Sequence, residues 1–203
     1  MHDESRLADA GSAAGGSNVA GSHQEEPLAT VPLAEQHRVA DFRCSKSQRI
    51  NDFFAKECPL FLKNNYCRVF VLANPDDPTD IWGYYTLSPS LLLRAHSTNS
   101  DQRKVPSGLP IPMVRIGFMG RSDSAPKGLG SALIVDAARR VHRNRDLAAW
   151  GLMLDAEGGP GTKLWTWYLE QGFMQADAKN NTQSGVMYGA LKKFLPELQQ
   201  QQQ

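Results

Sequence analysis

Gly128 and Gly130 are the clearest chemical signal in the chain, because they stand where a polar loop, residues 121–127, gives way to a helical pattern. The first N–H groups of a helix have no partner within it, and the helix dipole is positive at that end. A glycine lets an anion approach such a backbone closely. The spacing therefore predicts a phosphate site at residues 127–131, although a pair of glycines is also typical of a plain helix start.

Two common nucleotide signatures do not fit these glycines. The dinucleotide fingerprint needs a third glycine, and Gly117, Gly120, Gly128 and Gly130 have the wrong spacing for it. No Gly-Lys-Ser or Gly-Lys-Thr follows the loop, which excludes a nucleoside-triphosphate P-loop. The remaining interpretation is a diphosphate site of another kind.

Tyr168 is the candidate proton donor. A phenol with a pKa near 10 stays protonated at neutral pH and can protonate a departing thiolate. Its neighbours Trp165 and Trp167 indicate a core position equally well, so the residues alone leave both roles open. His96 and His142 are available as bases, but positions on a loop and on a helix surface are the simpler interpretation, and no base is assigned.

The elements that position these residues follow from the apolar pattern. Leu129, Leu133, Ala137 and Val141 recur every fourth residue and predict a helix over residues 129–143. Strands are expected in the apolar runs at residues 67–73, 81–87, 113–119, 150–154 and 186–191. Two further helices are expected, one beginning at residue 45 and one over residues 162–171. This order predicts one α/β domain with a single mixed, mainly antiparallel sheet flanked by helices.

The ends of the helices carry local signals. Ser45 and Gln48 have the spacing of a capping box, so the first helix is expected to begin at Ser45. Pro59 is expected to break or kink that helix. Gly172 is expected to end the helix over residues 162–171.

Composition divides the chain into three parts. Residues 1–36 are rich in Ala, Gly, Ser and acidic residues and are expected to be a disordered tail; residues 37–195 form the domain, and 196–203 are a polar C-terminal tail. The whole chain has a net charge of +1. Because the first 40 residues are net acidic, the body is modestly basic, which is compatible with a phosphate-rich ligand without requiring one.

Three cysteines, Cys44, Cys58 and Cys67, show no metal-binding spacing and cannot form a closed set of disulfides. They are expected to be buried thiols in a reducing compartment. No apolar run is long enough to span a membrane, and the N-terminus lacks the apolar segment of a signal peptide. The sequence therefore predicts a cytoplasmic protein with no metal and no membrane partner.

Basic residues gather in two places. Solvated helix faces are the simpler interpretation of both groups, and contact with nucleic acid is the alternative. The first group lies before and within the first predicted strand, and the second lies on and after the long helix: Lys46, Arg49, Lys56, Lys63 and Arg68, then Arg139, Arg140, Arg143 and Arg145.

The loop at residues 128–130 and the ending Trp167-Tyr168-Leu169-Glu170-Gln171-Gly172-Phe173 together resemble the GCN5-related N-acetyltransferase superfamily. That resemblance covers about residues 113–175. It implies acetyl-CoA as the co-substrate and Tyr168 as the catalytic acid. It also implies that acetyl-CoA is bound through Phe118, Met119, Gly120, Lys127, Gly128, Leu129, Gly130 and Ser131.

A second resemblance covers most of residues 37–195. Four short motifs occur in the order seen in the acetyltransferase toxins of toxin–antitoxin pairs: Phe42-Arg43-Cys44, Ile50-Asn51-Asp52-Phe53, Gly83-Tyr84-Tyr85-Thr86-Leu87-Ser88 and Pro110-Ile111-Pro112. This resemblance implies acetylation of the amino group of aminoacyl-tRNA, which blocks translation. It also implies a ribbon-helix-helix antitoxin and a homodimer as partners.

Three positions depart from these families. Ala125 stands where the diphosphate motif carries Gln or Arg, Gly117 stands where the toxins usually carry Arg, and residues 157–161 lengthen a connection. Two alternatives therefore stay open. One is an acetyltransferase for a small-molecule or protein amine, and the other is an acyl-CoA-binding regulatory module without catalysis.

Overall fold

A seven-stranded sheet in the order β1-β2-β3-β4-β5-β7-β6 forms the centre of this computed structural model, which describes residues 29–195. Only β4 and β5 run parallel, which confirms the mixed, mainly antiparallel sheet expected from the sequence. The strands are β1 (Val31–Pro32), β2 (Arg68–Asn74), β3 (Asp77–Leu92), β4 (Ile111–Arg121), β5 (Gly151–Asp155), β6 (Met174–Gln175) and β7 (Val186–Ala190).

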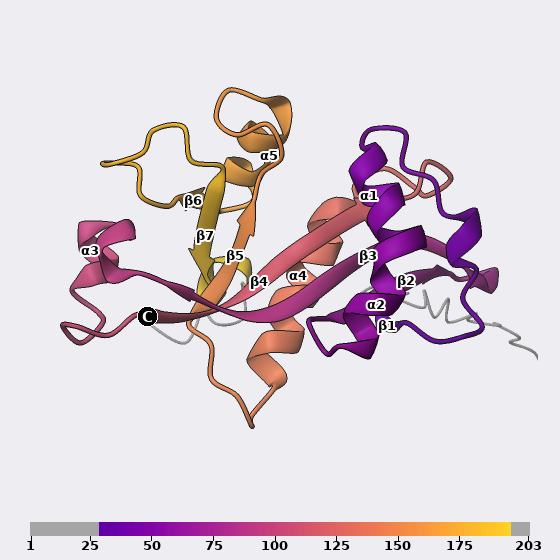
Figure 1. Cartoon of the computed structure of the whole chain (residues 1–203), viewed down its shortest axis with the longest axis horizontal. Coiled ribbons are helices and arrows are strands. Elements are labelled where there is room, and N and C mark those ends of the chain that lie inside the picture. Colours follow the sequence, from indigo (N-terminus) through magenta and orange to yellow (C-terminus); the bar gives the residue numbers. More distant parts are fainter. Residues whose placement is uncertain (1–28, 196–203) are drawn as a thin grey trace, which may run out of the picture.

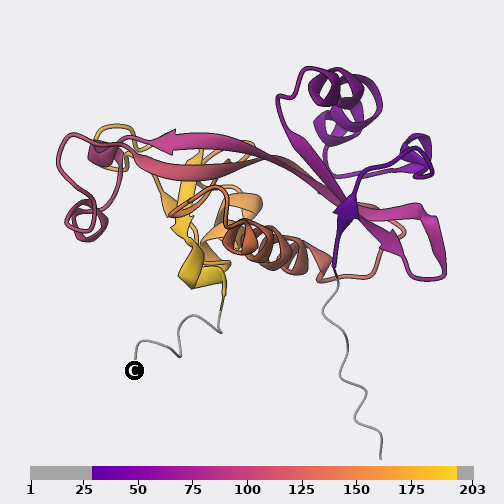
Figure 2. The same cartoon turned by 90° about the horizontal axis from the view of Figure 1, so that it is seen from below.

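Helices cover both faces of the sheet, as Figure 2 shows for α1 and α2 on one side and α4 on the other. Phe53, Phe54 and Tyr84 pack together beneath α1 and α2, whereas Tyr85 and Leu133 are buried beneath α4. The helices are α1 (Gln48–Asp52), α2 (Cys58–Lys63), α3 (Asn99–Gln102), α4 (Leu129–Arg143), α5 (Lys163–Glu170) and α6 (Leu191–Phe194).

The strands β4 and β5 diverge, and this divergence creates the site described below. They pair only at residues 113–115 of β4 and 151–153 of β5. The strand β4 stays paired with β3 as far as Arg121, so its second half has a neighbour on one edge only. Figure 1 shows β5 and β7 turning away from the long β3–β4 pair. Backbone groups on the open edge of β4 are therefore available to a ligand.

A β-bulge interrupts β4 at residues 117–118. Tyr85 pairs with Met119 and Leu87 with Ile116, so two residues of β4 oppose Thr86. Since successive side chains of a strand alternate between faces, one extra residue reverses the alternation. Ile116 packs on the α4 side, and after the bulge it is Met119 that packs there.

The first helix begins later than the capping pattern predicts, so the assignment of Ser45 as its cap is wrong. Ser47 caps α1, because its hydroxyl accepts the N–H of Ile50. Ser45 instead donates its hydroxyl and its backbone N–H to the Asp123 carboxylate. That competing partner, 78 residues away in the sequence, explains why the local pattern failed.

Pro59 does not end the helical segment. It lies in the first turn of α2, where a proline needs no hydrogen-bond partner for its nitrogen. A π-helical turn, Phe53–Glu57, precedes it and joins α1 to α2. This turn is a recognised way for a helix to absorb an irregularity, so the chain continues to Lys63.

The described structure begins before His37, where the sequence placed the start of the domain. The two residues of β1 pair with β2. Just before them, the Thr30 hydroxyl donates to Asp136 of α4 over 2.5 Å, and Arg140 donates to the Thr30 carbonyl over 2.7 Å. A two-residue strand is too short to show an alternating pattern. The tail expected over residues 1–36 therefore extends too far, because residues 29–36 belong to the described structure. Residues 1–28 and 196–203 lie outside the described residues.

Several expectations are confirmed. The helix expected over residues 129–143 is α4, and the strands expected over residues 67–73 and 81–87 lie in β2 and β3, which pair antiparallel. The helix over residues 162–171 is α5, capped by Thr162 and followed by Gly172 at a φ of 97°. Among residues 29–195, no helix has the length and apolar character needed to cross a lipid bilayer.

Candidate active site

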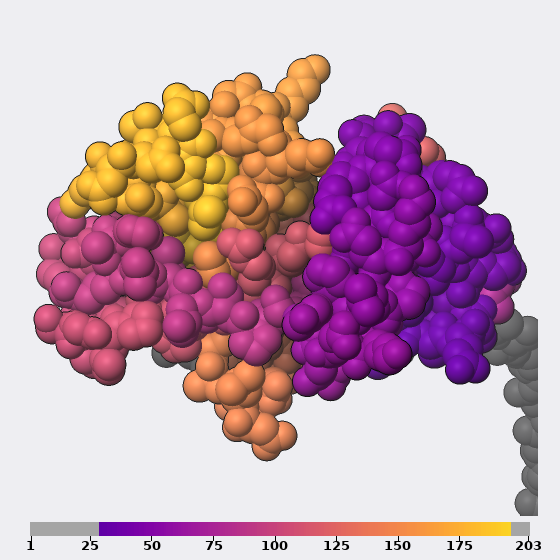
Figure 3. All heavy atoms as spheres, viewed as in Figure 1, coloured from indigo at the N-terminus to yellow at the C-terminus, as the bar shows by residue number. Residues whose placement is uncertain are grey.

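A cavity of about 880 Å³ lies where β4 and β5 separate. Figure 3 shows the corresponding hollow between the purple segment of α1 and the orange segment of β5 and α5. The open half of β4, the start of α4 and one face of α5 line it together. Most residues assigned to the site from sequence meet in this cavity: Phe118, Met119, Gly120, Gly128, Gly130, Ser131 and Tyr168.

The N-terminus of α4 lies in the wall of the cavity. Gly128 is the N-cap at a φ of 90°, a left-handed conformation that favours glycine, and no side chain caps the helix. The first turn tightens through a 3.2 Å hydrogen bond from the Ser131 N–H to the Gly128 carbonyl. A helix N-terminus without a side-chain cap leaves N–H groups to bind an anion.

Two of the residues assigned to the site, Lys127 and Leu129, do not line the cavity. Lys127 is exposed and does not line the cavity. Leu129 is 5% exposed and packs in the core beneath α4, so its side chain faces away from a ligand. Any contact from Leu129 is restricted to its backbone N–H, which lies in the first turn of the helix.

The helix α5 packs closely against Gly130 and leaves little room there for a side chain. A Cβ atom at this position would lie 3.1 Å from the ring of Trp167, which also lines the cavity. The ring therefore packs directly over the first turn of α4. The spacing of the glycines predicted either the approach of a ligand or a plain helix start, and the structure shows close packing between two walls of the site at Gly130.

The open half of β4 contributes backbone groups. The Phe118 N–H is not free, because it donates to the Thr86 hydroxyl over 3.0 Å. Adjacent N–H groups of an extended strand point to opposite sides. We therefore expect the Met119 N–H to point to the edge that β5 has left. The bulge at residues 117–118 lies directly before Met119.

Tyr168 lies in the wall formed by α5 and is 7% exposed. Burial raises the pKa of its hydroxyl above the ordinary value, and the nearby Glu157 carboxylate raises that pKa further. Among residues 29–195, no buried side-chain N or O atom lacks a hydrogen-bond partner, and no protein group bonds to the Tyr168 hydroxyl. The hydroxyl is therefore open to the cavity, protonated and available to donate.

Charged groups of both signs line the cavity, and most were not assigned from sequence. Nothing in their local sequence distinguishes them from solvated surface residues, because only the fold brings them to one place. The cations are Lys46, Arg49, Arg121 and Lys163, and the anions are Asp123, Asp155 and Glu157.

The histidines and most basic residues singled out in the sequence lie elsewhere. Neither His96 nor His142 lines the cavity. Lys56 pairs with Asp52, and Arg140 lies 4.0 Å from the centre of the Phe70 ring. Arg49 also pairs with a carboxylate, but it does line the cavity. In the described part of the chain, no cluster of His, Cys, Asp or Glu could hold a metal ion.

No protein-family model matches this sequence, and no curated protein matches it. Solved structures do. A tyrosine-to-phenylalanine mutant of KacT superposes with a TM-score of 0.71 at 22% identity, over 85% of this chain and 99% of that chain. AtaT complexed with acetyl-methionyl-tRNAfMet gives a TM-score of 0.69 at 22% identity, over 83% and 97%. AtaTR bound with AcCoA gives 0.64 at 23% identity, over 81% and 94%.

These matches cover nearly the full length of the other chains. They confirm the fold that the motifs around Gly128 and Tyr168 led us to expect. The fold of this chain is that of the KacT and AtaT structures.

Proposed function

We propose that this protein is an acetyl-CoA-dependent N-acetyltransferase that modifies the amino group of aminoacyl-tRNA and thereby blocks translation. The observation that carries the proposal is one cavity that brings together the N-terminus of α4, the open edge of β4 and the Tyr168 hydroxyl. These are an anion site, a source of backbone N–H groups and a proton donor, which acetyl transfer from a thioester to an amine needs in one place.

The acetyl donor, acetyl-CoA, fits this cavity. Its diphosphate would lie at the first turn of α4, where Gly128, Gly130 and Ser131 line the wall. Acetyl-CoA supplies an activated acetyl group when it is bound. The Met119 N–H would then stabilise negative charge on the acetyl oxygen. The cavity volume of about 880 Å³ is within the range of cofactor sites.

Tyr168 would act at the sulfur. The attacking amine forms the new C–N bond as the C–S bond breaks, and the phenol gives its proton to the departing thiolate. The amine loses one proton, and the Tyr168 phenolate regains one through solvent, so protons balance. The raised pKa of Tyr168 keeps this acid protonated at neutral pH.

The proposed acceptor of the acetyl group and the proposed partners are taken from the structural neighbours. AtaT is complexed with acetyl-methionyl-tRNAfMet in one of them, and in another it is bound to the C-terminus of the antitoxin AtaR. By analogy we propose aminoacyl-tRNA as the acceptor here, and an antitoxin of ribbon-helix-helix type and a homodimer as the assembled forms. The site of action would be the cytoplasm, where aminoacyl-tRNA is found.

The decisive experiment incubates the purified protein with acetyl-CoA and charged tRNAs and identifies acetylated aminoacyl groups by mass spectrometry. The proposal predicts this product from the wild type. Tyr168→Phe should lower its formation at least tenfold, as expected for loss of a general acid. Tyr66→Phe is the matched control, because Tyr66 is 62% exposed and does not line the cavity.

Two results would contradict the proposal. Acetylation of small primary amines without any acetylated aminoacyl-tRNA would exclude the proposed acceptor and retain the transferase. Binding of acetyl-CoA without transfer to any amine would exclude catalysis altogether.

A further inference from the structure

Arg121 is a cation of the cavity to which the motifs assign no role. It is the last residue of β4 and pairs there with Gly83 of β3. Its guanidinium Nη1 donates to the Ala125 carbonyl and, over 3.4 Å, to the Pro126 carbonyl. The side chain therefore reaches from the end of β4 to the loop that leads directly into the N-terminus of α4.

The charge of Arg121 is not neutralised by the protein. No carboxylate in the described part of the chain forms an ion pair with it. Both printed hydrogen bonds use Nη1 and end on neutral carbonyl oxygens. The guanidinium has five N–H donors, so those of Nε and Nη2 remain for another partner. A half-buried guanidinium with free donors in a cavity points to an anionic ligand.

Position 125 cannot supply this contact. In the superfamily motif, a Gln or Arg side chain at this position helps to bind the diphosphate, and here the residue is Ala125. It is 6% exposed and packs in the core beneath α4, together with Leu129. A long polar side chain is therefore missing from the loop itself.

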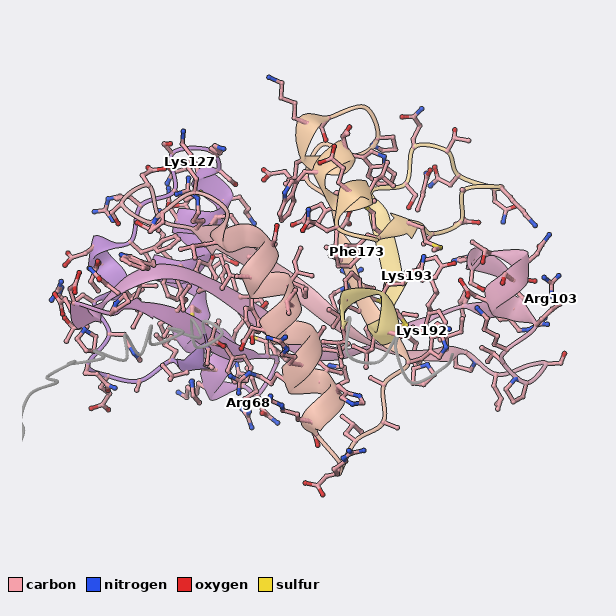
Figure 4. The ribbon with its side chains drawn as sticks, turned by 180° about the vertical axis from the view of Figure 1, so that it is seen from behind. Arg68, Arg103, Lys127, Phe173, Lys192 and Lys193 are labelled. Atoms are coloured by element: carbon pink, nitrogen blue, oxygen red, sulfur yellow. The ribbon has the colours of Figure 1, made fainter. Side chains whose placement is uncertain are left out.

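Lys127 is the other cation of the loop, and its position is unsuitable. Figure 4 shows its side chain at the outer end of the loop, pointing away from the body of the protein. It is exposed and is not part of the cavity lining. Exposed lysines are strongly hydrated and flexible, so their contribution to anion binding is small.

We propose that Arg121, and not Lys127, binds the diphosphate of acetyl-CoA from the end of β4. Arg121 would thus replace the motif side chain that is missing at Ala125. Arginine suits this role because its planar fork donates two parallel hydrogen bonds to a phosphate. This inference rests on the proposed function, since it assumes that the cavity takes acetyl-CoA.

The test measures binding of CoA and of dephospho-CoA by calorimetry in three variants. Arg121→Gln removes the charge but keeps a donor for the Ala125 carbonyl, and Arg121→Lys keeps the charge without the fork. Lys127→Gln is the matched control, a charge removal six residues away. Circular dichroism and thermal unfolding verify that each variant is folded.

Arg121→Gln should weaken binding of both ligands about ten- to a hundredfold, the usual effect of losing a charged hydrogen bond. It should also reduce the dependence of the dissociation constant on salt concentration, because one ionic contact is lost. Arg121→Lys should recover part of the affinity. Lys127→Gln should change the affinity less than threefold.

Four results would overturn the inference. A loss confined to CoA would place Arg121 at the 3′-phosphate, which dephospho-CoA lacks. An unchanged salt dependence in Arg121→Gln would show that Arg121 only shapes the loop. Unchanged affinity in Arg121→Gln, or a larger loss in Lys127→Gln, would remove Arg121 from the site. If the wild type binds neither ligand, the proposed function fails instead.

Discussion

The Ser47 hydroxyl donates a 2.9 Å hydrogen bond to Glu157 Oε2 and so joins two walls of the cavity that are 110 residues apart in sequence. The same hydroxyl accepts the N–H of Ile50 and caps α1. Glu157 stands at the start of a glycine-rich connection between β5 and α5, residues 156–162. Three glycines there have positive φ values, which residues with side chains rarely adopt, and the contact with Ser47 adds a restraint from the start of α1.

Ser47→Ala should loosen the connection between β5 and α5. Hydrogen exchange of residues 156–162 should become faster, because local opening no longer breaks the contact with Glu157. Affinity for acetyl-CoA should fall a few-fold, since one wall of the cavity becomes less ordered. Ser45→Ala is the control, because it breaks a bond to Asp123 on a different loop. Unchanged exchange in residues 156–162 would show that the contact does not hold the connection.

The pH dependence of transfer should reflect the raised pKa of Tyr168. Burial and the Glu157 carboxylate both favour the neutral phenol, so the acid form persists above the ordinary pKa of about 10. The rate should therefore show no alkaline decline from Tyr168 up to about pH 10. Glu157→Gln removes one cause of the raised pKa of Tyr168 and should therefore move any such decline to lower pH. A decline at neutral pH in the wild type, absent from Tyr168→Phe, would contradict this assignment.

Gly151→Ala should destabilise the protein. The added Cβ atom would lie 2.2 Å from the Gly189 carbonyl oxygen of β7, and backbone atoms cannot move aside without disturbing the sheet. The free energy of unfolding should fall by about 1–3 kcal/mol, as in other overpacked cores, and urea denaturation measures it.

Gly130→Ala is the comparison for that substitution. Its Cβ atom would meet only the edge of the Trp167 ring at 3.1 Å, and a side chain can shift. It should cost less stability than Gly151→Ala but weaken acetyl-CoA binding, because Trp167 would move into the cavity. Equal losses of stability in the two variants would show that the Trp167 contact is as rigid as the backbone.

The three cysteines should differ in reactivity. Burial raises the pKa of the Cys58 thiol to about 12, and Cys67 also has a raised pKa because of burial. The thiolate is the reactive form, so neither should react with iodoacetamide at pH 8 unless the protein unfolds. Cys44 lines the cavity, and acetyl-CoA should slow its modification. Peptide mapping by mass spectrometry would identify the modified thiol, and rapid labelling of native Cys58 would contradict the burial.

The sequence was sufficient where a signal is local and repeated. The helix α4 has four apolar residues at helical spacing, and its predicted range matches the structure. The turn after α5 was identified because Gly172 needs a left-handed backbone, which few other residues tolerate. The glycines at the start of α4 and Tyr168 belong to short contiguous motifs, and the structure brings them to one cavity, but their roles in binding and catalysis stay predictions.

Other features depend on contacts between distant residues and could not be predicted. Ser45 looked like a helix cap, but it bonds to Asp123, and Ser47 is the cap. The bulge in β4 changes which residues pack on the α4 side, and although Gly117 lies in it, one glycine in a strand does not specify a bulge. Arg121 and Glu157 resemble ordinary surface residues in the sequence, and only the divergence of β4 and β5 places them in the site.

Titration of the wild-type protein with acetyl-CoA in a calorimeter measures whether the cavity at the start of α4 binds the co-substrate. We expect saturable binding of one acetyl-CoA per chain, with the same affinity in Tyr168→Phe, since Tyr168 would act on the sulfur during transfer and not on the diphosphate. Absence of measurable binding to the folded wild-type protein would show that the cavity at the start of α4 is not an acetyl-CoA site.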